Sequence, residues 1–342
     1  MADTINSDFF LPLRDAGEAV RIERGVDLAV DAERVRIEFI RPDVARVKIS
    51  YGGDFDLQPT RAVVSDDFGP VPFTLERDGE GLVLASGALK VVLKFRPFSF
   101  DVFRADGSPV LRSVPGKAYS HLNGHWRVVR KKGVGDGVFG LGQKTGKLNR
   151  NGRSFVMWNT DIMANASEDD ALDPEFDPYY MSIPFFYHLI SGGAASGSFI
   201  DNGYRLRFDF TAPDSYTVEA DGGQFTEYIF AGPAMPDILA RYTELTGRME
   251  LPPIWALGHH QCRWHDYRAE DVRRLARPSR EKGIPCDVLW LDIDYMDDFR
   301  IFTWDRGKFP DPAALSAGLE KQGFRLITII DPGVKHDPGY PV

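Results

Sequence analysis

Cysteine is scarce in this chain of 342 residues, which contains only Cys262 and Cys286. Two cysteines cannot form a framework of several disulfides, which excludes a small disulfide-stabilised secreted domain. Two thiols fit a reducing compartment, and residues 1–8 lack the basic and apolar regions of a signal peptide. We therefore expect a cytoplasmic protein.

Long apolar runs and blocks of basic residues are also absent. No stretch of about 20 apolar residues occurs, so we expect neither a membrane-spanning helix nor a membrane partner. The chain has 41 Lys and Arg against 50 Asp and Glu, a net charge of −9, so nucleic acid is not expected as a partner. The short basic stretch at residues 127–132 is expected to be a solvated strand or turn. What the chain has is length and a hydrophobic content of 43%, enough for two domains.

Up to about residue 232 the sequence is typical of β-strands separated by turns. Apolar and polar residues alternate at residues 35–39, 89–95 and 204–210, as in half-buried strands. Turn signals follow at residues 105–108 and 220–223, and the second predicts a hairpin. Many short strands with such turns predict an N-terminal antiparallel β-sandwich, which we assign to residues 1–252.

The pattern changes after this point to alternating helices and strands. Helical spacing and a capping glycine, Gly247, predict a helix at 236–247. Beyond it we expect strands at 255–259, 287–293 and 325–330, with helices at 269–282 and 312–322. Pro278 is expected to kink or shorten the first of these two helices. This alternation predicts parallel βαβ units.

Polar or aromatic groups follow each of the three expected strands, at Trp264, at Asp292-Ile-Asp294 and at Asp331. The carboxyl ends of the strands form the functional face of a (β/α)₈ barrel. Such a barrel needs about 250 residues, whereas 90 remain from 253 to 342. We therefore predict an α/β domain at 253–342 that holds the first βα units of an incomplete (β/α)₈ barrel.

Asp292 and Asp294 are the strongest candidates for chemistry. Residues i and i+2 of a strand point to the same side, so both carboxylates are expected to leave the strand together. They fit a general acid/base pair, metal ligands, hydroxyl binders or caps of the next turn. Carboxylates so close on one strand end cannot straddle a sugar ring as a retaining glycosidase requires. We favour one carboxylate binding sugar hydroxyls, and the other anchoring Arg, Lys or backbone N–H groups.

Three further features have both a functional and a structural interpretation. Trp264 fits a platform for a sugar face or simple packing at the rim. The histidines 259, 260 and 265 lack the spacing of a zinc site, so hydrogen bonding is favoured over metal binding, and no cofactor is expected. Asp161 fits a turn residue or a substrate contact. The acidic stretch 168–177 is expected to be a solvated loop, because the spacing of a calcium-binding EF-hand is absent.

Several motifs together resemble glycoside hydrolase family 31, the α-glucosidase family. They are Gly140-Leu-Gly-Gln-Lys-Thr-Gly146, Trp158-Asn-Thr-Asp161, Asp177-Pro-Tyr-Tyr-Met-Ser-Ile-Pro-Phe185, Leu257-Gly-His-His-Gln-Cys-Arg-Trp264 and Trp290-Leu-Asp-Ile-Asp-Tyr-Met296. The Asp-Ile-Asp-Tyr-Met form is similar to the α-glucosidase branch, whereas α-xylosidases usually carry Phe-Trp-Met there. Gln143 stands where the family usually has Glu, so the local salt bridges are expected to differ.

The resemblance implies a galactose-mutarotase-like β-sandwich, a (β/α)₈ barrel and C-terminal β domains. It implies retaining hydrolysis of terminal α-glucosidic bonds in an α-glucoside oligosaccharide, through an aspartate nucleophile and an aspartate acid/base. It assigns Asp161 and Asp292 to the non-reducing glucose at subsite −1. Trp264 and Ile329 would line the same pocket.

One motif of the family is missing from this chain. The nucleophile of the family lies in a Trp-x-Asp-Met-x-Glu motif, which does not occur in this chain. We therefore expect the first part of a longer enzyme, without the nucleophile or acid/base and inactive alone. An α-xylosidase or transglucosidase of the same family, or a non-catalytic carbohydrate-binding β-sandwich, remains an alternative. Formation of a homo-oligomer is left open.

Overall fold

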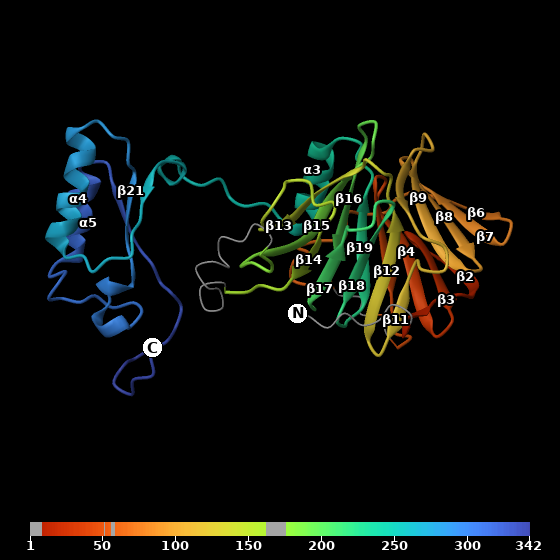
Figure 1. Cartoon of the computed structure of the whole chain (residues 1–342), viewed down its shortest axis with the longest axis horizontal. Coiled ribbons are helices and arrows are strands. Elements are labelled where there is room, and N and C mark those ends of the chain that lie inside the picture. The colour runs from red at the N-terminus through yellow and green to blue at the C-terminus, as the bar shows by residue number, and fades with distance from the viewer. Residues whose placement is uncertain (1–8, 51, 56–58, 162–175) are drawn as a thin grey trace. The chain divides into compact units, whose positions relative to one another are not determined.

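The computed structural model describes residues 9–50, 52–55, 59–161 and 176–342 (Figure 1). The chain divides into two compact units, Met1–Arg248 and Met249–Val342, and each is described by itself. In the described residues, no helix combines the length and the apolar character needed to cross a membrane.

The described part of the first unit contains three antiparallel sheets and the helix α3 (Met235–Thr246). The six-stranded sheet has the order β1 (Leu11–Pro12), β11 (Ser120–Leu122), β12 (His125–Lys131), β18 (Ser215–Ala220), β17 (Leu206–Asp209) and β14 (Ser154–Met157). The eight-stranded sheet has the order β13 (Gly137–Gly142), β15 (Ser182–Leu189), β16 (Ala195–Ile200), β19 (Phe225–Phe230), β5 (Val44–Ile49), β4 (Glu33–Arg41), β3 (Gly25–Val30) and β2 (Ala16–Ile22). The five-stranded sheet has the order β10 (Pro109–Arg112), β9 (Phe98–Arg104), β8 (Leu89–Phe95), β7 (Gly81–Ala85) and β6 (Thr74–Asp78).

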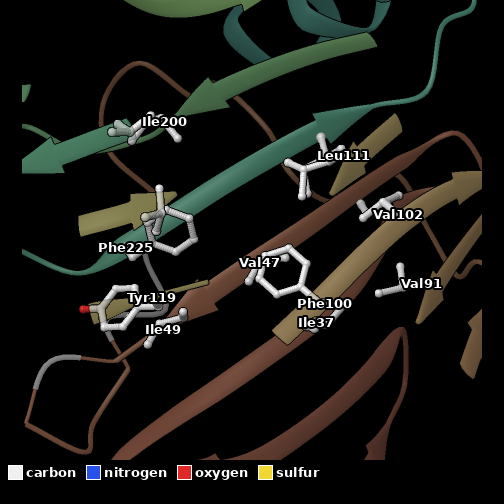
Figure 2. Close-up of a cluster of buried hydrophobic side chains, with 14 of the residues drawn as sticks. Ile37, Val47, Ile49, Val91, Phe100, Val102, Leu111, Tyr119, Ile200 and Phe225 are labelled. Atoms are coloured by element: carbon white, nitrogen blue, oxygen red, sulfur yellow. The ribbon is translucent and has the colours of Figure 1, made fainter. Parts of the chain in front are cut away.

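The sandwich core lies between the six-stranded and eight-stranded sheets. Trp126 on β12 meets Phe225 on β19 edge to face, with ring centroids 5.0 Å apart. Phe186 on β15 meets Tyr216 on β18 in the same way, at 5.4 Å. Figure 2 shows that Phe100 of the five-stranded sheet reaches the same core. The expected strands at 35–39, 89–95 and 204–210 are confirmed as β4, β8 and β17, so the alternating pattern identified the sandwich.

A buried ion pair also joins the two sheets. Arg130 on β12 donates from Nη2 to Glu227 Oε2 on β19 at 3.0 Å, and both side chains are at most 2% exposed. Ser198 on β16 donates to the other carboxylate oxygen at 2.7 Å. Residues 127–132 are expected from the sequence to be solvated, and that expectation is wrong for Lys132, which is buried, and for Arg130. Its neighbours Arg127 and Lys131 do face outward, because side chains alternate along β12.

The hairpin expected at residues 220–223 is also wrong. β18 pairs with β12 and β17, whereas β19 pairs with β16 and β5. Both edges of each strand are therefore occupied by other partners, and residues 221–224 carry the chain from one sheet to the other.

Helix α3 follows the last strand of the unit and confirms the expected helix at 236–247. Ile238 and Leu245 form its buried face. Gly247 ends the helix with a φ of +90°, a backbone conformation that favours glycine over residues with a Cβ.

The described part of the second unit is a small α/β structure, and its sheet has the order β20, β21, β22 with all strands parallel. Its elements are the 3₁₀ turn η2 (Ile254–Leu257), β20 (His260–Gln261), α4 (Ala269–Glu281), β21 (Val288–Leu291), the 3₁₀ turns η3 (Ile293–Tyr295) and η4 (Asp297–Phe299), α5 (Pro312–Glu320) and β22 (Arg325–Thr328). Its core packs the helices onto the sheet through residues such as Ala276, Leu289 and Leu315. The predicted combination of a β-sandwich with the first βα units of a barrel is thus confirmed.

One expected element of this unit, its first strand, differs from the structure. The strand expected at 255–259 is instead the turn η2, and strand pairing starts only where Val288 N–H donates to His259 O at 3.2 Å. The Asp287 carboxylate fills the space beside Gly258, where a Cβ would lie 1.9 Å from Oδ2. The helix expected at 269–282 is confirmed as α4, which contains Pro278 and is not shortened by it.

Candidate carbohydrate site in the second unit

The candidate residues of the second unit follow its parallel strands at their carboxyl ends. Asp292 comes directly after β21, and Ile329 directly after β22. The register pairs Leu291 with Thr328, and Ile329 N–H donates to Leu291 O at 3.0 Å. Trp264 follows β20, which lies on the other side of β21. The three residues therefore belong to one edge of one sheet, where parallel α/β folds place their functional groups.

Asp292 leaves the strand differently from the sequence-based expectation. The strand ends at Leu291, so the alternation rule does not reach Asp292 or Asp294. Asp292 caps the turn η3, and its Oδ1 accepts the Ile293 N–H at 2.8 Å. In the described residues, no hydrogen bond reaches Oδ2. A carboxylate has further acceptor capacity after one such bond, so this half-buried group can still bind a hydroxyl.

Asp294 binds a side chain that the sequence did not point to. Its Oδ2 accepts the indole N–H of Trp264 at 2.9 Å, rather than an Arg, Lys or backbone N–H group. Trp264 is 69% exposed, so this bond, and not burial, sets the direction of its ring. Lys308 holds the same turn, because Nζ donates to Asp294 O at 3.1 Å and lies 2.7 Å from Asp266 Oδ1. The hydrogen bond to Asp266 raises the pKa of Lys308, which keeps it charged.

Tyr295 joins the turn after β21 to the end of β22. Its hydroxyl donates to Ile329 O at 2.9 Å, and its ring packs on Trp304 at 4.9 Å. Tyr295 is buried and Ile329 half-buried. The position of Ile329 is therefore fixed by a side chain that follows the other candidate strand. Neither Tyr295 nor Lys308 was assigned a role from the sequence, because each acts through a contact that sequence spacing does not reveal.

The histidines of this edge take part in local contacts. Trp290 donates its indole N–H to His260 Nδ1 at 3.2 Å. His265 packs edge to face on Tyr267 at 4.7 Å. Across the described ranges, no group of three or more His, Cys, Asp or Glu side chains is arranged to hold a metal ion.

Asp161, the fourth candidate, belongs to the first unit and is exposed. It follows β14, and the residues just before it hydrogen-bond to residues 179–182. Thr160 N–H donates to Tyr179 O at 3.1 Å, and Ser182 N–H donates to Asn159 Oδ1 at 2.9 Å. Residues 162–175, and with them most of the acidic stretch 168–177, lie outside the described residues.

A buried ion pair lies beside β14, the strand that precedes Asp161. Lys144 Nζ is fully buried and lies 2.6 Å from Asp177 Oδ1, and it also donates to Val156 O at 2.6 Å. The other oxygen of Asp177 accepts the Val156 N–H at 2.5 Å. Burial lowers the pKa of Lys144, while the contact with Asp177 opposes that shift. These buried contacts tie β14, the strand that precedes Asp161, to residues 144 and 177.

Comparison with known proteins agrees with both units. Residues 34–209 match the glycosyl hydrolase 31 N-terminal galactose mutarotase-like domain, and residues 249–342 match the glycosyl hydrolases family 31 TIM-barrel domain. The chain belongs to glycosyl hydrolase family 31. This confirms the resemblance inferred from the motifs.

Relatives within family 31 include α-glucosidases. Alpha-glucosidase 2 of Bacillus thermoamyloliquefaciens is 40% identical over 314 residues, which are 91% of this chain and 39% of the relative. The alpha-glucosidase of Saccharolobus solfataricus is 32% identical over 260 residues, which are 74% of this chain and 36% of the relative. The chain thus spans less than half the length of these relatives.

Solved structures of the family share the fold. The family 31 dextranase of Flavobacterium johnsoniae, solved with glucose, superposes with a TM-score of 0.82 and 27% identity. The match covers 93% of this chain and 38% of the dextranase chain.

Proposed function

We propose that this chain is the sugar-binding part of a retaining α-glucosidase that releases glucose from the non-reducing end of α-glucoside oligosaccharides. One observation carries the proposal. A carboxylate with remaining acceptor capacity, Asp292, follows the central strand of a family 31 barrel segment, and an oriented tryptophan and an isoleucine follow the flanking strands. The similarity to α-glucosidases over most of the chain supports the choice of substrate.

Within this proposal each residue has a physical role. The Asp292 carboxylate accepts hydrogen bonds from two sugar hydroxyls, or from one hydroxyl in addition to Ile293 N–H. The Trp264 ring, held by Asp294, offers an apolar face to the C–H groups of the sugar. Ile329 supplies an apolar wall. Asp161 contributes a second carboxylate from the first unit, and neither the nucleophile nor the acid/base is assigned to a residue of this chain.

The test uses the complete protein encoded by the gene that contains this chain, assayed with p-nitrophenyl α-glucoside and α-xyloside. We expect hydrolysis of the glucoside, and a loss of kcat/KM of about 100-fold or more in Asp292→Asn, because a charge-assisted hydrogen bond is lost at the reacting sugar. The matched control is Asp297→Asn, an exposed carboxylate in the next turn, which should retain activity. Wild-type activity in Asp292→Asn would refute the assigned role.

The alternatives give different results in the same assay. Preference for the α-xyloside would indicate an α-xylosidase, and transfer of glucose to maltose in place of release would indicate a transglucosidase. The lack of any glycoside turnover, together with glucan binding by the protein, would favour a non-catalytic carbohydrate-binding protein. A panel of maltose, isomaltose and dextran measures linkage preference.

We further propose a cytoplasmic location. Cys262 and Cys286 are free, with Cys262 exposed, as fits a reducing compartment. Cell fractionation with an antibody tests the location, and recovery outside the cytoplasm would refute it. Size-exclusion chromatography with light scattering measures whether the protein forms a homo-oligomer.

A further inference from the structure

The first unit has a groove on the outer face of its six-stranded sheet. Trp126, Val128 and Arg130 of β12 point into the core, so Arg127 and Val129, which alternate with them, face outward. A cavity of about 540 Å³ lies on this outward face. A second cavity of about 680 Å³ shares Lys117, Val129 and Ser215 with the first, so the two cavities adjoin at these residues. Each volume lies in the range of small-molecule sites, about 300–1,000 Å³.

The strand register arranges the groove in rows across β12, β18 and β17. In the first row, Glu219 stands opposite both Arg127 and Arg207. In the next row, Thr217 stands opposite Val129 and Asp209. The side chains of the second row, such as Val129 and Thr217, are shorter than those of the first row. The second row therefore forms the floor of the groove, and the first row forms its raised end.

The raised end has fixed hydrogen-bonding groups. Arg127 Nε donates to Glu219 Oε1 at 2.6 Å, and Arg207 Nη1 donates to Glu219 Oε2 at 3.4 Å. One carboxylate therefore orients two guanidinium groups, each of which carries five N–H donors. Such oriented donors bind oxygen atoms of a ligand at a lower entropic cost than freely rotating side chains do.

The floor and the far side offer groups that complement hydroxyls. Ser215 donates to the neighbouring Asp214 Oδ1 at 3.3 Å, and a hydroxyl that donates still has acceptor capacity. In the part of the chain that the structure describes, Thr217 Oγ1 and Lys117 Nζ have no hydrogen bond or ion pair. The first cavity thus contains three cationic groups (Lys117, Arg127 and Arg207) and two carboxylates (Asp209 and Glu219). This near balance of charge fits a neutral ligand with many hydroxyls better than a polyanion.

We propose that this groove is a saccharide-binding site that holds a linear α-gluco-oligosaccharide, in addition to the residues placed at Asp292. Along β12 the groove extends from Arg127 to Lys131. This is about 13 Å of strand at about 3.3 Å per residue, which exceeds the length of a single sugar ring. The assignment to α-glucans rests on the proposed function, whereas the preference for a hydroxyl-rich ligand rests on the groove itself. A glucan held here raises the local concentration of chain ends for the enzyme.

The test is isothermal titration calorimetry of the 342-residue chain with maltotetraose. Thr217→Trp fills the floor with an aromatic side chain, and we expect Kd to rise by about tenfold or more, as for the loss of at least one good hydrogen bond. The matched control is Thr74→Trp, the same substitution at an exposed position of β6 in the five-stranded sheet, which should leave Kd unchanged. Because Asp292 is itself a proposed sugar contact, each protein is also titrated in the Asp292→Asn background. There the binding assigned to Asp292 is lost, and the groove should keep its own Kd, which separates the groove from the proposed function.

The remaining outcomes decide the proposal as follows. If Thr217→Trp lowers the melting temperature strongly by circular dichroism, Lys117→Ala replaces it, and a rise in Kd of about threefold or more is expected for the lost contact. Lack of saturable binding, equal binding by wild type and groove variants, or displacement of the sugar by inorganic phosphate would overturn the proposal. Loss of binding in Asp292→Asn alone would also overturn it, while leaving the α-glucosidase proposal intact.

Discussion

The buried ion pair between Arg130 and Glu227 allows a quantitative test of the sandwich. Glu227→Ala leaves the Arg130 guanidinium in a core where it is 1% exposed, and it also removes the acceptor of Ser198. Removal of one partner from a buried pair typically costs about 3–5 kcal/mol, because the remaining charge has lost its compensation. For a unit of this size, each kcal/mol corresponds to about 2–4 °C in melting temperature. We therefore expect the first unit to melt about 6–20 °C lower in the variant.

The measurement is thermal and urea denaturation followed by circular dichroism. The matched control is Asp15→Ala, which removes an exposed ion pair with Arg96. The Asp15 side chain is 63% exposed and the Arg96 side chain 69%. Exposed pairs contribute about 0–1 kcal/mol, so the control should stay within a few degrees of wild type. The double variant Arg130→Met, Glu227→Leu removes both charges and should recover much of the loss. A change below about 1 kcal/mol in Glu227→Ala would refute the reasoning, since it lies outside the range for buried pairs.

Three further predictions concern single positions. Burial lowers the pKa of His188 despite its hydrogen bond to Asp136 at 2.7 Å. Because the unfolded chain then binds the proton more readily than the folded chain, the free energy of unfolding should fall as pH drops from about 7 to 5. Urea denaturation should show a smaller fall in His188→Phe. Gly232→Ala should destabilise the first unit by about 2 kcal/mol or more, since a Cβ would lie 2.1 Å from Ala195 O. The control is Gly107→Ala, which also has a positive φ but has open space for a Cβ, and it should cost about 1–2 kcal/mol. Equal losses would contradict the role of the clash. Asp294→Leu should speed solvent exchange of the Trp264 indole N–H severalfold by NMR but leave the Trp290 indole, bonded to His260, unchanged; an unchanged Trp264 signal would refute the anchoring role.

The sequence was most informative where local patterns decide the structure. The alternation at residues 89–95 matches β8 at both ends, and the spacing after residue 235 with Gly247 identified α3. The same reasoning failed at residues 220–223, because β19 pairs with β16 and β5 rather than with β18, and a turn signal does not reveal such partners. It failed again for Arg130, where the residue type suggests solvent but the alternation along β12 points it into the core.

In the candidate site, too, the sequence indicated the residues but not the contacts that orient them. The carboxyl ends of parallel strands indicated Trp264 and Asp292, because that rule depends only on the order of elements, whereas Ile329 was indicated only by the resemblance to family 31. The contacts that orient these residues were not predictable. The bonds from Trp264 to Asp294 and from Tyr295 to Ile329 join residues 30 and 34 positions apart, which only the folded chain brings together.

The passage of the chain from β18 to β19 has a consequence for how the first unit folds. These consecutive strands lie in opposite layers. β18 pairs with the preceding strand β17 and with the more distant β12, whereas β19 pairs with β5, so Phe225 meets Ile49. Neither layer can therefore be completed as a local unit before the other begins to form. Folding dominated by such distant pairing is slow, in the range of milliseconds to seconds, and it leaves unpaired strands exposed while it proceeds. Residues 221–224 thus couple the two layers into one cooperative folding step.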